Sequence, residues 1–426
     1  MASHRKAYII DIAILVIVAI ILAITMAFSR AIEFALGLSY YKTVDVTAGD
    51  TGEGDGFVSD DGQLKVNFID VGQGDCTIIQ LPDGKAMIID AGKGNKSVKA
   101  SIDNFIDENF DESFKYFDYA ILTHPDDDHC GSWAYVLNKY PARVCYRPNV
   151  EATKDYTDPA GSLPKKKETA AYRDAVKAMY KQIDGEPNTV YITDPKSDEQ
   201  TIVGEDNSYT FTFYSPLSEV YTDWNDYSPI MILSYKGFNF AISGDAEKTN
   251  ESEFAEKVKS ARTDGVTDKY DIFTDSYTVN LIKCGHHGSR TSTSQAYIDA
   301  ITTPEGAQQA YYIISCGEGN SYKHPHKETL NRLKDMGVPD DNVLRTDILG
   351  TITISVRMDA NGNYNLFYGN VAKKSVLTYN KIGNIDLTWP LVAWVGYAVL
   401  VIVVALHAAG LKFFGGGSDG GRGKRR

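Results

Sequence analysis

One stretch decides the fold: Ile121-Leu122-Thr123-His124-Pro125-Asp126-Asp127-Asp128-His129-Cys130-Gly131. The apolar run at residues 119–122 predicts a buried strand, and residues 129–137 have helical spacing. A strand, a sharp loop and a helix would direct two imidazoles and three carboxylates at one point. Hard or borderline divalent cations need such a set of ligands. The stretch therefore favours a metal site over the alternative, a solvated acidic turn with two incidental histidines.

Histidines elsewhere in the chain are arranged in the same way. Six of the eight fall in three clusters, and each cluster follows an apolar run that predicts a strand. A fourth polar loop, Ser243-Gly244-Asp245, also follows such a run. Polar loops at several strand ends are expected where sheet edges converge on one site. The clustered histidines are His124 and His129, His286 and His287, and His324 and His326.

The order of these motifs resembles the metallo-β-lactamase superfamily. The motifs are FIDVGQGD at 68–75, IIDAG at 88–92, HxDxDH at 124–129, SGD at 243–245 and HHGS at 286–289. They look most like the hydrolase domain of ComEC-type competence (DNA-uptake) proteins, and NxYxHP at 320–325 and RTD at 345–347 fit that branch. The likeness spans about residues 64–368.

This resemblance implies an α/β (α+β) fold, a four-layer αβ/βα sandwich with two divalent metal ions, Zn2+ or Mn2+, at one edge of its sheets. By the resemblance, His124 and Asp126 would hold the first ion, Asp128, His129 and His286 the second, and Asp245 would bridge them. The commoner pattern has a histidine at position 126 and a further histidine ligand before the bridging aspartate, but no histidine occurs from 130 to 285. Asn225 lies where that ligand would be sought. The first position would thus be oxygen-rich and weaker, would favour Mn2+ over Zn2+, or would fill only with substrate.

Catalytic roles follow from two such ions, which would activate a bound water and clamp the reacting oxygens. Asp128 would orient the hydroxide as well as bind metal. His287 or His324, outside the inner ligands, would donate a hydrogen bond to a phosphoryl oxygen or protonate the leaving group. Three further aspartates are expected to fix backbone and ligand orientation: Asp70, Asp75 and Asp90.

Two apolar runs, at 8–28 and 391–411, flank this domain, and each is long enough to cross a bilayer. Positive charge lies outside both runs, in the segment 4–6 and in the tail 412–426, which predicts cytoplasmic termini and an extracytoplasmic catalytic domain at the cell membrane. The expected organisation is an N-terminal membrane anchor (1–30), an acidic Gly-rich linker (31–63), the hydrolase domain (64–370), a linker (371–388), a C-terminal transmembrane helix (389–411) and a basic Gly-rich tail (412–426).

Composition limits the partners. A net charge of -13 and a pI near 5.1 argue against broad affinity for polyanions. A local basic rim from Lys283, Arg290, Lys323 and residues 165–167 would suit phosphates, although the same residues could be ordinary surface. Residues 165–183 are predicted to form a charged helix near the site. The five cysteines show no CxxC spacing, which excludes a zinc ribbon and leaves disulfides open.

The sequence thus predicts a membrane-anchored, metal-dependent hydrolase of phosphodiester bonds, with DNA favoured by the resemblance. One alternative is a hydrolase of a cell-envelope polymer, such as a teichoic acid or a phosphocholine ester, which suits an acidic protein outside the cell. The other is a non-catalytic envelope scaffold whose metal is structural. Fold analogy alone cannot choose among substrates.

Overall fold

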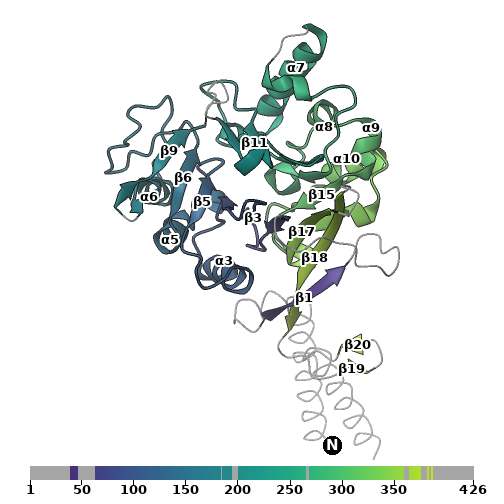
Figure 1. Cartoon of the computed structure of the whole chain (residues 1–426), viewed down its shortest axis with the longest axis horizontal. Coiled ribbons are helices and arrows are strands. Elements are labelled where there is room, and N and C mark those ends of the chain that lie inside the picture. The colour runs from purple at the N-terminus through teal and green to yellow at the C-terminus, as the bar shows by residue number, and fades with distance from the viewer. Residues whose placement is uncertain are drawn as a thin grey trace, which may run out of the picture. The chain divides into compact units, whose positions relative to one another are not determined.

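The computed structural model describes residues 39–46, 63–183, 185–193, 200–264, 268–358, 364–375, 381–382 and 385–386 (Figure 1). Residues 41–372 form one compact unit, and residues 1–40 with 373–426 form another. In the second unit, β19 (Lys381–Ile382) pairs with β20 (Ile385–Asp386). The predicted membrane segments at 8–28 and 391–411 and the tail lie outside the described residues. Within the described part of the chain, no helix is both long enough and apolar enough to span a bilayer.

The first of two mixed sheets has nine strands. Its order is β1 (Ser39–Val46), β18 (Tyr364–Ser375), β17 (Thr351–Met358), β2 (Leu64–Phe68), β3 (Thr77–Gln80), β4 (Ala86–Ile89), β5 (Phe117–Ile121), β6 (Ala142–Arg147) and β9 (Thr189–Ile192). Strands β18 to β4 pair antiparallel, and β4 to β9 pair parallel. Strand β1 lies inside the predicted linker 31–63, and β18 runs beyond residue 370, where the hydrolase domain was expected to end.

The second sheet has seven strands. Its order is β10 (Thr201–Val203), β11 (Thr210–Phe213), β12 (Met231–Tyr235), β13 (Phe238–Ile242), β14 (Leu281–Lys283), β15 (Tyr311–Ile314) and β16 (Val343–Arg345). Pairing is antiparallel from β10 to β13 and parallel from β13 to β16. A small separate pair consists of β7 (Gln182–Ile183) and β8 (Glu186–Pro187).

Helices cover the outer face of each sheet (Figure 1). On the first sheet lie α3 (Lys96–Asn109), α5 (Trp133–Lys139) and α6 (Ala170–Met179). On the second lie α7 (Lys248–Asp264), α8 (Gln295–Ile301), α9 (Pro304–Gln309) and α10 (Lys327–Asp335). Short turns of helix are α4 (Asp127–Cys130), α11 (Thr346–Leu349), η2 (Glu205–Asn207), η3 (Asn225–Tyr227), η4 (Lys269–Ile272), η5 (Gly285–Gly288) and η6 (Asp340–Asn342).

Alternation along the strands explains the layers. In β4, Ile88 packs under the helices of the first sheet, whereas its neighbours Met87 and Ile89 pack between the two sheets. On the facing sheet, Phe240 points into the same inter-sheet core and meets Phe68 with ring centroids 5.7 Å apart. A strand buried on both faces reads as a continuous apolar run. The predicted four-layer αβ/βα sandwich of two mixed sheets is confirmed for the described residues.

The expected helix at 165–183 is wrong in its extent. Helix α6 begins only at Ala170, after Thr169, whose hydroxyl accepts a hydrogen bond from the Tyr172 amide (3.4 Å). Residues 165–167 are extended instead, because Glu151 pairs with Lys166 as an isolated bridge. This pairing places the lysine run beside the loop at the end of β5, where Lys167 pairs with Asp126. All five cysteines are buried and free of disulfides.

Candidate metal centre

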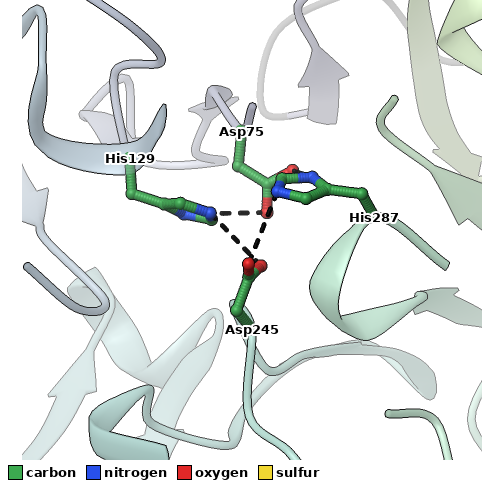
Figure 2. Close-up of side chains that lie close together, drawn as sticks. All are labelled: Asp75, His129, Asp245 and His287. Atoms are coloured by element: carbon green, nitrogen blue, oxygen red, sulfur yellow. Dashed lines mark ion pairs between the residues drawn. The ribbon is translucent and has the colours of Figure 1, made fainter. Parts of the chain in front are cut away.

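Loops from both sheets meet at one point (Figure 2). Asp75 follows β2, His129 lies in α4 after β5, Asp245 follows β13, and His287 lies in η5 after β14. Each offers one ligand atom, and all four of these atoms lie within 4.8 Å of one another, on side chains that are all buried. The centre is therefore assembled from segments that only the folded sandwich brings together.

Gly74 allows the first of these loops to approach the second. The Asp75 amide donates a hydrogen bond to the Asp128 carbonyl oxygen (3.2 Å). A Cβ on Gly74 would lie only 2.5 Å from that same oxygen, and the residue has a φ of +150°. Only glycine permits this contact without displacement of one loop.

Asp245 is the central carboxylate. Its Oδ1 lies 3.2 Å from His129 Nε2, and its Oδ2 lies 3.4 Å from His287 Nε2 and 3.8 Å from His286 Nε2. Burial by itself would raise the pKa of Asp245, but the three facing imidazoles hold this pKa well below its usual range. Its two oxygens thus face imidazoles from both sheets.

The orientation of His129 is fixed from behind by Asp90. The Asp90 carboxylate accepts hydrogen bonds from the Thr123 amide (2.9 Å), the Thr123 hydroxyl (2.7 Å) and His129 Nδ1 (2.8 Å). Because Nδ1 donates to Asp90, the ring turns Nε2 toward the centre, where this nitrogen would bind an ion after loss of its own proton.

His124 carries its proton on Nδ1 for a similar reason. Its Nδ1 lies 3.1 Å from the Thr123 hydroxyl and 3.3 Å from the Ser228 hydroxyl. The Thr123 hydroxyl already donates its hydrogen to Asp90, so it accepts from His124 Nδ1. Nε2 of His124 is left without a proton.

His287 and His286 complete the set. His287 Nδ1 lies 3.0 Å from the Ser315 carbonyl, which can only accept, and His286 Nδ1 lies 3.0 Å from a Glu247 carboxylate oxygen. Both imidazoles therefore carry the Nδ1 proton and turn Nε2 toward Asp245.

Polar atoms without hydrogen bonds gather where an ion would sit. Nε2 of His124, His129 and His287, and Oδ1 of Asp245, are buried and make no hydrogen bond. Buried polar groups in proteins are normally satisfied, so such a cluster points to a bound cation. Imidazole nitrogens with carboxylate oxygens are the ligands that Zn2+ and Mn2+ accept, and the residues fit such an ion.

The electrostatics agree with this fit. Burial would lower the pKa of His287, but Asp245 and Asp75 raise it to about 10, and the same balance at His129, with Asp245 and Asp90, raises its pKa well above 6.5. The negative potential that holds protons on these imidazoles would act equally on a metal cation.

Asp75 has a cation of its own. It forms a buried ion pair with Lys283, whose side chain is only 1% exposed, and its Oδ1 lies 3.3 Å from His287 Nδ1. Burial would raise the pKa of Asp75, but Lys283 and His287 lower it to about 2. Asp75, expected to orient other residues, thus has its charge balanced by Lys283 and also belongs to the four-residue group.

The two residues expected at the first metal position, His124 and Asp126, lie outside the four-residue group. His124 Nε2 is 3.8 Å from Asp126 Oδ2, and the His124 and His129 rings have centroids 4.1 Å apart. Asp126 is one-third exposed, and its Oδ1 is paired with Lys167 at 2.5 Å. Asp128 Oδ2 lies 3.6 Å from His287 Nε2, within reach of the same centre.

The two adjacent histidines differ from their expected positions. His287, expected outside the inner ligands, is buried and belongs to the four-residue group, whereas the His286 side chain is 23% exposed and stands 3.8 Å from Asp245. Both have positive φ (47° and 54°), and this tight left-handed turn directs the second imidazole inward toward Ser315. Sequence spacing carries no signal for such a turn.

His324 has the opposite tautomer. Gln73 accepts a hydrogen bond from the Gly317 amide at Oε1 (3.2 Å), so its amide nitrogen faces His324 Nδ1 at 3.3 Å and donates to it. The proton of His324 therefore lies on Nε2. Its ring centroid is 5.3 Å from that of His286, and Tyr322 stacks on it. The Nε2–H group of His324 is thus available as a hydrogen-bond donor.

Sequence reasoning missed three charged partners. Lys283, expected at a basic rim, is instead buried against Asp75. Glu247 fixes His286, and Lys167 pairs with Asp126. Lys283 is the last residue of a buried strand, three positions before the HHGS motif, and this position is the signal that could have identified it.

The sandwich and its imidazole–carboxylate centre define the class of protein, a hydrolase fold with a metal-binding group. The sequence profile of the metallo-beta-lactamase superfamily matches residues 69–307, and the chain belongs to this superfamily. ComE operon protein 3 of Bacillus subtilis is 26% identical over 301 residues, which cover 68% of this chain and 32% of that protein. Recombination protein 2 of Haemophilus influenzae is 27% identical over 63% of this chain and 26% of its own length.

These matches, with a shorter one to the competence protein ComA of Neisseria gonorrhoeae, confirm the relation to ComEC-type competence proteins. The matched region spans about a third of these relatives or less. Among solved structures, CmlA, a diiron beta-hydroxylase from Streptomyces venezuelae, aligns over 70% of this chain and 55% of its own, with 11% identity and a TM-score of 0.36. A likeness this low supports no conclusion about chemistry.

Proposed function

We propose that this chain is a metal-dependent hydrolase of phosphodiester bonds that acts on nucleic acid, with DNA favoured. The observation that carries the proposal is the set of buried Nε2 atoms that face Asp245 and make no hydrogen bond. Hydrolysis of a phosphodiester needs an activated water and a counter-charge for the phosphoryl oxygens, and bound divalent ions supply both.

The chain's own side chains would divide the remaining work. His129 and His287 would hold one ion through Nε2, with Asp245 and Asp128 as oxygen ligands, and His124 would face the other position with Asp126. The Asp128 carboxylate would also accept a hydrogen bond from the attacking water and orient it. Burial, followed by the nearby His287 and His286, lowers the pKa of His324 to about 4, so this imidazole is neutral at pH 7. With its proton on Nε2, His324 would donate a hydrogen bond to a phosphoryl oxygen rather than protonate the leaving group.

Substrate and location rest on the relatives and on the sequence. Two of the relatives are named for recombination and for competence, and both processes involve DNA. The apolar runs at 8–28 and 391–411 support an anchor in the cell membrane, with the hydrolase domain on its extracytoplasmic side and both termini in the cytoplasm. The membrane and DNA, or a cell-envelope polymer, would then be its partners.

The test uses the purified full-length chain with Mn2+ or Zn2+. Hydrolysis of bis(p-nitrophenyl) phosphate and of single-stranded DNA is measured for the wild type, for Asp245→Asn and for the control Asp127→Asn. Asp127 belongs to the same motif, but its side chain is exposed and outside the centre. We expect cleavage of both substrates by the wild type and the control, and loss of both activities in Asp245→Asn.

Other outcomes favour the alternatives. Cleavage of the small ester alone would favour a hydrolase of a cell-envelope phosphodiester. A folded, metal-loaded chain that cleaves neither substrate would favour a non-catalytic scaffold with a structural metal.

A further inference from the structure

Lys167 stands where the first metal position would need a cation. Its ammonium lies 2.5 Å from Asp126 Oδ1, while Asp126 Oδ2 faces His124 Nε2 at 3.8 Å. We propose that Lys167 supplies the positive charge at this position, so that the centre holds one divalent ion tightly and admits a second only when Lys167 leaves Asp126. This inference rests on the proposed metal-dependent function and concerns how many ions that function uses.

The backbone presents Lys167 to the site. The Glu151 amide donates to the Lys165 carbonyl (2.7 Å), and the Lys167 amide donates to the Glu151 carbonyl (2.9 Å). This short ladder keeps residues 165–167 extended, so that successive side chains alternate in direction. Lys166 turns outward and is 53% exposed, whereas Lys167 is only 18% exposed.

An aromatic ring stabilises the same ammonium. Lys167 Nζ lies 4.9 Å from the centre of the Trp224 ring, within the range of a cation–π contact. Lys165 Nζ lies 4.0 Å from that ring and donates to the Tyr221 carbonyl oxygen (2.8 Å) and the Thr222 carbonyl oxygen (2.6 Å). The Lys167 side chain is therefore held by its ion pair with Asp126, by the Trp224 ring and by the backbone ladder.

The ligands available for a second ion are few. Among the described residues, the group able to hold an ion is Asp75, His129, Asp245 and His287, and it contains neither His124 nor Asp126. Asn225 lies in the segment where a further ligand was expected, but its amide nitrogen faces Glu247 Oε1 and His286 Nδ1, at 3.4 Å from each. The first position is left with His124, Asp126 and a share of Asp245.

The pairing of charges points the same way. Lys283 pairs with Asp75, and Lys167 pairs with Asp126. Asp128 and Asp245 lie against imidazoles and remain available to an ion, whereas the Asp126 carboxylate at the first position already has a cation. A second ion would stand a few ångströms from the Lys167 ammonium in a partly buried site, where the repulsion between +1 and +2 charges is large enough to weaken binding at least about tenfold.

Titration of the metal-free full-length chain with Mn2+ tests this count. Calorimetry gives the affinities, and the electron paramagnetic resonance signal of free Mn2+ gives the number of ions bound. For the wild type we expect one tight ion and a second that binds at least about tenfold more weakly. In Lys167→Met the second ion should bind at least about tenfold more tightly, with little change for the first.

Two variants serve as controls. Lys167→Arg keeps the charge and should behave as the wild type. Lys166→Met removes the neighbouring ammonium, which pairs with Glu151 at 3.3 Å, and should also leave Mn2+ binding unchanged. Thermal unfolding monitors the fold of each, and Lys167→Gln replaces Lys167→Met if the latter does not fold.

Several results would overturn the inference. Equal affinity for two ions in the wild type, or an unchanged or weaker second ion in Lys167→Met, would mean that Lys167 only orients Asp126 as a ligand. Mn2+ binding to no variant would overturn both this inference and the metal-dependent function. The expected binding pattern without hydrolysis of either test substrate would support the inference and refute the proposed function alone.

Discussion

Replacement of Asp90 by asparagine probes the hydrogen bonds behind the centre. The carboxylate accepts from the Thr123 amide and hydroxyl and from His129 Nδ1, at 2.7–2.9 Å. Asparagine keeps one oxygen for the Thr123 amide but places an NH2 group against His129 Nδ1–H, so that two donors face each other. The conflict is relieved if the imidazole moves its proton to Nε2, which is the atom that faces Asp245 and would bind the ion.

Two effects set the magnitude. Loss of a partner that orients a metal-binding histidine typically weakens metal affinity about 10–100-fold, which corresponds to about 1.4–2.8 kcal/mol. Loss of a hydrogen bond to a buried charged group costs about 1.5–3 kcal/mol of folding free energy. Because the bond to the Thr123 amide is retained, we expect the free energy of unfolding to fall by about 2 kcal/mol.

Calorimetric titration with Mn2+ and unfolding in urea measure the two effects separately. Asp118→Asn is the matched control, because Asp118 lies at the far end of the same pair of strands and its Oδ2 accepts a hydrogen bond from the Ala86 amide (3.0 Å), which an asparagine oxygen can still accept. The control should leave the Mn2+ affinity within about twofold of the wild type, as for a distant site. Full Mn2+ affinity in a folded Asp90→Asn variant would refute the assigned His129 tautomer.

Three further outcomes follow from buried charges and close packing. Lys283→Met should destabilise the chain by about 3–5 kcal/mol in urea, because Asp75 is left as an unpaired buried charge, and adding Asp75→Asn should recover most of this loss. Burial raises the pKa of Glu251 from 4.5 to about 7. A raised carboxyl pKa favours folding below pH 4.5 and loses that contribution as pH rises through 7, so the stability of the wild type relative to Glu251→Gln should fall by up to about 3 kcal/mol across this window in urea titrations. Gly74→Ala would place a Cβ 2.5 Å from the Asp128 carbonyl and should lower both the thermal unfolding temperature and the affinity for Mn2+.

The layers of the fold could be predicted because they depend on local patterns. The predicted strand at 119–122 lies within two residues of β5, and strands β13, β14 and β15 stand where apolar runs precede Asp245 and the later histidines. Polar loops at strand ends could also be found, because clustered histidines and aspartates follow these runs directly in the sequence.

Pairings between distant charges could not be predicted from the sequence. Lys283 meets Asp75 across 208 positions of sequence, and both belong to motifs that also read naturally as a basic rim and an acidic loop. The inward turn of His287 depends on two consecutive positive φ angles, which the sequence HHGS does not dictate. Such features depend on how the two sheets pack, and a linear pattern carries no record of that.

The charge pairs also bear on why the sandwich can close around so many carboxylates. Asp75 and His129 come from loops of the first sheet, and Asp245, Lys283 and His287 come from the second. Without cations, the facing carboxylates would repel one another in a site from which water is largely excluded, and would oppose the apolar contact between the sheets. The buried Lys283–Asp75 pair instead links the two sheets beside the centre, where its two charges balance each other without an ion.

A bound ion would add to this stability by binding to the folded state. The gain would rise with the ratio of the ion concentration to its dissociation constant. The chain neutralises part of its own site and leaves Asp245, the one carboxylate that contacts three imidazoles, for the metal.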